Sequence, residues 1–132
     1  MIVDSSALVA IMREEQEATR FLSAIKDASD RSVSAATYIE SSIVLLGRAS
    51  QSNAFPELDE LLARARIEIE PVLFADARLA RDAFRTFGKG RHKAGLNFGD
   101  CFTYALSRRL RRPILCKGND FALTDATVVT LT

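Results

Sequence analysis

The sequence contains few of the residue types on which several common functional sites depend. Its 132 residues include one histidine, two cysteines and no tryptophan. A structural zinc site usually needs a full set of nitrogen and sulfur ligands, so these three side chains cannot form one. The single histidine, His92, has no serine or cysteine motif beside it, which argues against its being the base of a nucleophilic triad.

Long apolar runs are also missing, because no stretch approaches the roughly 20 residues that a membrane span needs. Residues Met1–Asp4 contain neither a basic segment nor a cleavage site of small residues, so no signal peptide is expected. The expected location is therefore the cytoplasm, where disulfide bonds are rare. Cys101 and Cys116 lie among apolar neighbours, and we expect both thiols to be reduced core residues.

The residues that are present are typical of one globular domain spanning residues 1–132. Apolar residues make up 48% and charged residues 27% of the sequence, enough for a hydrophobic core. The net charge of +1 hides an uneven distribution, because residues 1–77 carry 13 acidic and 7 basic side chains whereas residues 78–118 carry 2 and 11. This cationic stretch favours a polyanionic partner. The alternative is that its arginines only solvate two helix faces.

Hydrophobic periodicity predicts that strands and helices alternate along the chain. The predicted strands cover Met1–Asp4, Ser32–Ser34, Ile67–Leu73, Pro113–Cys116 and Thr127–Leu131. The predicted helices cover Ala7–Met12, Glu14–Asp27, Ala36–Ser50, Pro56–Arg66, Ala75–Phe87 and Asn97–Leu110, and residues 88–95 form a basic, glycine-rich loop. Strands separated by helices favour a parallel sheet covered on both faces, so the predicted fold class is α/β.

Four carboxylates occupy positions where a site could form, and each also has a purely structural explanation. Asp4 follows the first predicted strand, where it could bind a ligand at the carboxyl edge of the sheet or simply cap the next helix. Glu40 shares its helical face with Ile43, Val44 and Gly47. A carboxylate on such an apolar face needs compensation, either at a metal site or from a buried arginine.

The other two carboxylates also fit ordinary local structure. Asp100 lies three residues after Asn97, the spacing of a capping box, and Asp120 lies in the polar turn after a predicted strand. The joint arrangement is more informative, because a parallel fold can bring all four acids to one edge of its sheet. Carboxylates packed together repel one another unless a hard cation such as Mg²⁺ or Mn²⁺, which prefers oxygen ligands, lies among them.

Four short segments that contain these acids occur in order along the chain: MIVDSSA from Met1, SAATYIE from Ser34, LNFGDCF from Leu96 and KGNDF from Lys117. In these segments the sequence resembles the PIN-domain ribonucleases, specifically the VapC-type toxins of bacterial toxin–antitoxin pairs. One short acidic motif is a weak signal, whereas four in this order, over a chain of matching length, are specific. The resemblance covers essentially the whole chain.

The resemblance implies a PIN-like α/β/α sandwich around a mainly parallel central sheet, usually in a homodimer. It also implies an endoribonuclease that depends on Mg²⁺ or Mn²⁺, hydrolyses RNA phosphodiester bonds with a metal-activated water and is inhibited by a VapB-type antitoxin protein. Carried over to this chain, Asp4 and Asp100 would be the principal metal ligands, and Glu40 and Asp120 would complete the catalytic pocket. Thr37 would support that pocket or help to start its helix.

The fourth segment departs from the family pattern. Many relatives place a threonine and an acid slightly earlier relative to the phenylalanine, whereas Lys117, Gly118 and Asn119 leave Asp120 as the only acid here.

The basic stretch supplies the predicted contacts with the RNA backbone. These come from Arg85, Lys89, Arg91 and Lys93, because phosphate contacts give affinity without reading the base sequence. The alternative is that the loop is only a mobile surface segment.

Two other functions are alternatives to a nuclease. A haloacid-dehalogenase-like phosphatase needs a second acid two residues after its nucleophilic aspartate, and Ser6 stands at that position. A catalytically silent PIN-like module would bind only an antitoxin, another partner protein or operator DNA, and the presence of all four acids argues against it. Ile39, Val44 and Leu45 spread apolar surface widely around one helix, which favours a binding partner in either case.

Overall fold

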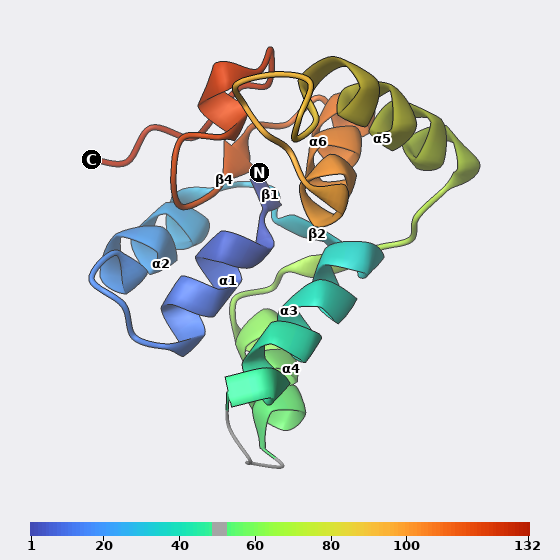
Figure 1. Ribbon diagram of the computed structural model, residues 1–132. Helices are drawn as coiled ribbons and strands as arrows, with labels where there is room; N and C mark the ends of the chain where they lie inside the picture. The colour runs from blue at the N-terminus through green and yellow to red at the C-terminus, as the bar shows by residue number, and fades with distance from the viewer. Residues whose placement is uncertain (49–52) are drawn as a thin grey trace.

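The computed structural model describes residues 1–48 and 53–132 of the chain (Figure 1). Its strands are β1 (Ile2–Val3), β2 (Ser32–Ser34), β3 (Glu68–Glu70) and β4 (Ile114–Leu115). Its helices are α1 (Ser5–Met12), α2 (Ala18–Asp27), α3 (Ala35–Arg48), α4 (Ala54–Arg64), α5 (Phe74–Phe87) and α6 (Phe98–Leu110), with a short 3-10 helix, η1 (Phe121–Leu123).

The strands form one parallel sheet in the order β3-β2-β1-β4. Ile2 lies opposite Ser32 on one side and Ile114 on the other, and Val33 lies opposite Ile69. Because every described strand pair is parallel, the carboxyl ends of the strands meet at a single edge of the sheet. The predicted α/β class with a mainly parallel sheet is confirmed.

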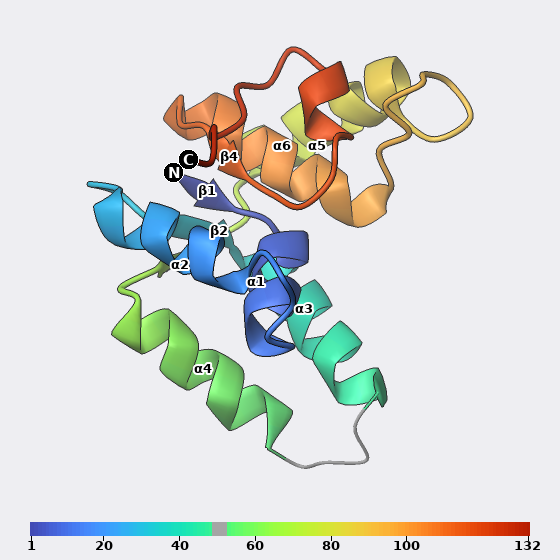
Figure 2. The ribbon, with the colours of Figure 1, turned by 90° about the vertical axis from the view of Figure 1, so that its left-hand side faces the viewer.

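Two hydrophobic cores cover the two faces of this sheet. Val3, Val33 and Leu115 point into the core formed with α1, α2 and α4, whereas Ile114 points into the core formed with α5 and α6. This alternation follows from the pleat of a strand, which turns successive side chains to opposite faces. Figure 2 shows α1, α2 and α4 on one side of the strands and α5 and α6 on the other, which is the predicted α/β/α sandwich.

Helix α3 lies at the carboxyl edge of the sheet rather than over one face. It follows β2 without a loop and packs against α1, α4 and α6. This placement brings Glu40 on α3 close to Asp4 and Ser5, which follow β1 at the predicted site. No helix of the described residues is long and apolar enough to cross a membrane.

Several predicted helix boundaries are wrong. The predicted helix Glu14–Asp27 begins only at Ala18, because Glu14 has a positive φ of 53° and the chain turns there. Helix α4 begins at Ala54, so Pro56 lies in its first turn as predicted, but the helix ends at Arg64 and not at Arg66, which has a positive φ. The end of the predicted helix Ala36–Ser50 lies outside the described residues.

Two predicted strands are shorter than expected or are missing. The strand predicted over Ile67–Leu73 is restricted to Glu68–Glu70 at the edge of the sheet. The segment Thr127–Leu131 is not a strand, since only Val128 forms an isolated bridge with Ile114. The β-branched residues there are explained by packing, because Val128 and Val129 are partly buried against the two cores.

Candidate active site

The carboxyl edge of the sheet carries the predicted acids. Asp4 follows β1, Glu40 lies in the second turn of α3 after β2, Asp100 lies in the first turn of α6, and Asp120 follows β4. The charges of Asp4, Glu40 and Asp120 all act to raise the pKa of Asp100. The structure therefore brings all four predicted carboxylates into one region, and we call them the acidic cluster.

Asp4 is buried and held at both of its carboxylate oxygens. Its Oδ2 accepts hydrogen bonds from the Ser6 backbone N–H at 3.1 Å and the Ser6 hydroxyl at 2.7 Å, and its Oδ1 accepts one from the Thr103 hydroxyl at 2.6 Å. The bond to the Ser6 amide also caps α1. Asp4 is thus a helix cap as well as a member of the acidic cluster, so its capping role does not remove it from the predicted site.

The Ser6 hydroxyl also connects β1 with β4. It accepts a hydrogen bond from the backbone N–H of Lys117 at 2.9 Å, while the Lys117 ammonium lies 2.9 Å from Glu15 Oε2 and 3.4 Å from Glu17 Oε2. The residues that replace the usual fourth motif therefore fix the end of β4 against the turn before α2. This contact orders the chain just before Asp120.

Glu40 is the least compensated acid of the cluster. Burial raises the pKa of Glu40 above its ordinary value, a hydrogen bond from Ser5 opposes this, and the charge of Asp4 adds to it. Its Oε1 atom is buried without a hydrogen-bond partner, and within the described residues no arginine pairs with it. An unsatisfied buried carboxylate oxygen is costly, so a cation is the compensation that fits this position.

Gly99 makes the position of Glu40 possible. A Cβ atom at Gly99 would overlap both oxygens and the carboxyl carbon of Glu40. The first turn of α6 must therefore present bare backbone to the carboxylate of Glu40. Sequence analysis gave Gly99 no role, although a glycine inside the first turn of a helix was a signal, because glycine weakens helices.

Asp100 is fixed by a capping box at the start of α6. The Asn97 side chain accepts a hydrogen bond from the Asp100 N–H at 2.8 Å, and the Asp100 carboxylate accepts one from the Asn97 N–H at 3.0 Å. Burial together with the charges of the other acids raises the pKa of Asp100 to about 6, against the lowering effect of the Asn97 hydrogen bond. As at Asp4, capping and membership of the acidic cluster coexist.

Asp120 lies at the exposed rim of the acidic cluster, directly before η1. Its side chain does not cap that helix. Cys116 directly follows β4, and burial together with the charges of Asp4, Asp100 and Asp120 raises the pKa of Cys116 to about 12. Both cysteines are free, as predicted, but only Cys101 is fully buried.

Thr37 lies in a buried hydroxyl network beside Asp4. Its Oγ1 is 3.3 Å from the Thr103 Oγ1, and the Thr103 hydroxyl donates to Asp4. The predicted support from Thr37 is therefore indirect. Thr103 was missed by sequence analysis, because nothing in a helical sequence shows that a residue near its middle bonds to a strand 99 residues away.

The acidic cluster is compatible with a divalent cation but is not a finished metal site. Among residues 1–48 and 53–132, no group of three His, Cys, Asp or Glu side chains is arranged to hold a metal ion. The donors are carboxylate oxygens, the type that Mg²⁺ and Mn²⁺ prefer. The unsatisfied oxygen of Glu40 and the raised pKa of Asp100 are both features that a cation would relieve.

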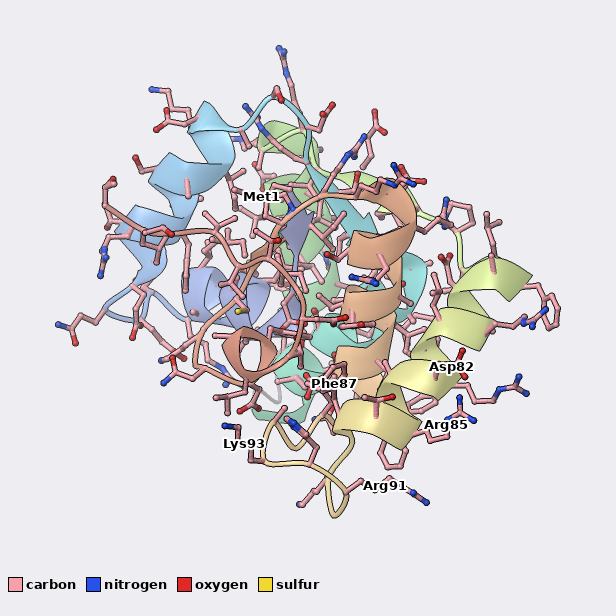
Figure 3. The ribbon with its side chains drawn as sticks, turned by 90° about the horizontal axis from the view of Figure 1, so that it is seen from above. Met1, Asp82, Arg85, Phe87, Arg91 and Lys93 are labelled. Atoms are coloured by element: carbon pink, nitrogen blue, oxygen red, sulfur yellow. The ribbon has the colours of Figure 1, made fainter. Side chains whose placement is uncertain are left out.

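The predicted RNA-binding cations gather around the loop that leads into α6. Arg85 is exposed at the end of α5 and pairs with Asp82 at 3.3 Å, and Lys89, Arg91 and Lys93 are exposed on the loop. Figure 3 shows Arg85, Arg91 and Lys93 at one end of the molecule, around Phe87. This basic loop is joined directly to the turn of α6 that carries Asp100.

Hydrogen bonds give the basic loop a defined framework. The backbone N–H of Lys89 donates to Leu96 O at 2.9 Å, and that of Leu96 donates to Phe87 O at 3.0 Å. His92 accepts a hydrogen bond from the Ala94 N–H through Nδ1, and its ring meets the edge of Phe87 at 5.2 Å. The single histidine thus orders the loop that displays the cations.

Comparison with known proteins agrees with this geometry. The model of the PIN domain family matches residues 1–126. Ribonuclease VapC30 of Mycobacterium tuberculosis is 44% identical over 131 residues, which cover 99% of both chains. Ribonuclease VapC28 of the same organism is 49% identical over 127 residues, covering 94% of this chain and 93% of its own.

Solved structures show the same fold at low sequence identity. Mycobacterium tuberculosis VapC20, described as a sarcin–ricin loop cleaving toxin, matches with a TM-score of 0.76 and 14% identity over 97% of both chains. A toxin–antitoxin complex from Klebsiella pneumoniae matches with a TM-score of 0.73 and 18% identity over 97% of this chain and 95% of its own. With the family model and the close mycobacterial relatives, these matches show that the chain belongs to the PIN-domain family, among the VapC ribonucleases.

Proposed function

We propose that this protein is an Mg²⁺- or Mn²⁺-dependent endoribonuclease that acts as the toxin of a toxin–antitoxin pair in the cytoplasm. The observation that carries the proposal is the acidic cluster, in which Glu40 has an unsatisfied buried oxygen and the pKa of Asp100 is raised to about 6. The ribonuclease names of the mycobacterial relatives and the description of VapC20 as a toxin support RNA as the substrate.

The residues of the acidic cluster have distinct roles in this proposal. Asp4 and Asp100 would hold the ion, because each is fixed by hydrogen bonds and the two lie at the amino ends of α1 and α6. A bound Mg²⁺ or Mn²⁺ would lower the pKa of a water molecule and neutralise charge on the phosphodiester. Glu40 would orient a water molecule for in-line hydrolysis, and Asp120 at the rim would add negative charge to the site.

The basic loop binds the RNA backbone in this proposal. Arg85 at the end of α5 and Lys89, Arg91 and Lys93 on the loop are exposed, and the loop leads to the helix turn that carries Asp100. A phosphodiester bound by these cations would therefore lie next to the acidic cluster. The cations also offset the repulsion between the RNA backbone and the carboxylates, which would otherwise oppose binding.

We also propose two protein partners, a VapB-type antitoxin and a second copy of this chain. The toxin–antitoxin complex among the structural matches supports the first. Exposed apolar side chains support a partner in general, since Ile39 and Ile43 on α3 are 57% and 62% exposed and Phe98 on α6 is 78% exposed. Of the apolar surface predicted on α3, Val44 is also exposed, but Leu45 is buried in the core.

The test of the proposed function is cleavage of a mixed pool of cellular RNA by wild type and Asp4→Asn, in Mg²⁺, in Mn²⁺ and in EDTA. We expect cleavage that requires the metal and falls roughly 100-fold or more in Asp4→Asn. Asp27→Asn, an exposed site on α2, is the matched control and retains activity. If wild type binds Mn²⁺ in a titration but leaves the RNA intact, the silent binding module is the correct function.

Asp100→Asn tests the link between the acidic cluster and the metal through stability. Because the folded-state pKa of Asp100 is raised, the metal-free wild type loses stability as the pH rises from about 4 through about 6. Asn preserves the capping hydrogen bond without the charge, so we expect metal-free Asp100→Asn to melt at a higher temperature than wild type at pH 8. The difference disappears at pH 4.

Added Mg²⁺ provides the second half of this measurement. It raises the melting temperature of the wild type, because it binds the folded state, and has little effect on Asp100→Asn. Equal responses of the two proteins to the metal would show that Asp100 is not a ligand.

Gly99→Ala tests the contact between α6 and Glu40. The added methyl group overlaps the Glu40 carboxylate, so we expect displacement of Glu40 and a fall in RNA cleavage of roughly 100-fold. Gly47→Ala, in the same helix as Glu40, is the control, because a Cβ there meets no described atom within 4 Å. Circular dichroism should show both variants folded, and full activity in Gly99→Ala would disprove the role of Glu40.

Removal of charge from the basic loop tests its contact with RNA. In an Asp4→Asn background, which prevents cleavage, we compare RNA affinity at several salt concentrations with and without glutamine at Lys89, Arg91 and Lys93. We expect the slope of log Kd against log salt to fall by roughly 2. A matched control carries three glutamines at exposed cations of α2 and α4, namely Arg20, Lys26 and Arg64. Equal slopes for the two triple variants would exclude the loop from RNA binding.

A further inference from the structure

Thr103 lies in the interior of the protein, yet its hydroxyl is used in a bond between separate elements. The side chain comes from the middle of α6 and is fully buried. Its hydroxyl donates to Asp4 Oδ1 at 2.6 Å and lies 3.3 Å from the hydroxyl of Thr37 on α3. A threonine in a helix often bonds back to a carbonyl of its own helix, whereas the contacts of Thr103 reach β1 and α3.

The direction of these hydrogen bonds follows from the chemistry of the groups. An ionised carboxylate can only accept, so the single hydroxyl proton of Thr103 goes to Asp4. The oxygen of Thr103 must then accept the proton of Thr37. The three residues form a directed chain from Thr37 through Thr103 to Asp4, which we call the threonine relay.

Packing alone does not account for this arrangement. A valine has nearly the same shape as threonine and would fill the same buried volume without the cost of removing a hydroxyl from water. The hydroxyl at Thr103 is therefore retained for its hydrogen bonds. Since Ser6 holds the other oxygen of Asp4, both hydroxyls together fix the rotation of the carboxylate.

We infer that Thr103 is a positioning residue of the acidic cluster, holding Asp4 Oδ1 in the orientation that binds the divalent cation. This inference rests on the proposed function. Thr37 acts on Asp4 through Thr103, because its hydrogen bond to the Thr103 oxygen leaves the Thr103 proton directed toward Asp4. Because Thr37 and Glu40 lie one turn apart on α3, the threonine relay also links the orientation of Asp4 to the helix that carries Glu40.

Three variants separate a positioning role from a packing role: Thr103→Val, Thr103→Ser and Thr37→Val. The first readout is Mn²⁺ affinity measured by calorimetry. We expect Thr103→Val to bind Mn²⁺ 10- to 100-fold more weakly, which is roughly the cost of losing a group that orients a metal ligand. Thr103→Ser keeps the donor and should stay near the wild-type affinity, and Thr37→Val should fall between the two.

The second readout needs no metal. In the metal-free protein, the ¹³C chemical shift of the Asp4 carboxyl carbon should change in Thr103→Val and return toward the wild-type value in Thr103→Ser. A melting curve for each variant records any loss of packing.

The outcomes distinguish the inference from the proposed function. Wild-type Mn²⁺ affinity and an unchanged Asp4 signal in Thr103→Val would overturn the positioning role, as would equal loss of affinity and stability in Thr103→Val and Thr103→Ser. If the wild type itself binds no Mn²⁺, the proposed metal site is wrong. The Asp4 carbon signal then decides alone whether Thr103 orients this carboxylate.

Discussion

Repulsion among partly buried carboxylates is the constraint on which the functional edge of this protein is built. Asp4, Glu40 and Asp100 are brought together by three separate elements, and burial opposes the ionisation of Glu40 and Asp100. Hydrogen-bond donors stabilise two of these carboxylates: Ser6 and Thr103 donate to Asp4, and the Asn97 amide donates to Asp100. Two of the acids also lie at helix amino ends, where the helix dipole favours negative charge. Glu40 Oε1 is left without a donor, so the stabilisation by the protein itself is incomplete.

The same local rules explain why the acids could be located from the sequence but not assigned one role. The sequence correctly predicted that Asp4 and Asp100 cap helices. The resemblance to VapC-type toxins assigned the same two acids to the metal site. The structure shows that capping is compatible with membership of the acidic cluster, since the capping bonds hold the two carboxylates in place. For Glu40 the sequence allowed a buried arginine, and none pairs with it in the described residues.

What the sequence could not reveal depends on contacts between distant segments. The roles of Gly99 and Thr103 follow from the position of Glu40 and Asp4 in space, and no local pattern encodes those contacts. The errors in secondary structure have a similar origin. The apolar residues of 127–131 pack on the cores, so their sequence pattern resembles that of a strand although no strand forms. The helical pattern before Ala18 gave no indication that the backbone turns at Glu14. Periodicity reports which residues are buried more reliably than which backbone hydrogen bonds they make.

The hydrogen bond from Thr103 to Asp4 joins residues 99 positions apart. On a ribosome the chain emerges from its amino end at roughly 5–20 residues per second, so Asp4 exists for several seconds before Thr103 has been synthesised. Asp100 emerges shortly before Thr103, and Asp120 emerges after it. An incomplete chain therefore has no acidic cluster, whatever its secondary structure. The order of residues along the chain delays assembly of the acidic cluster until residue 120 has been synthesised, which separates the start of synthesis from the assembly of the cluster.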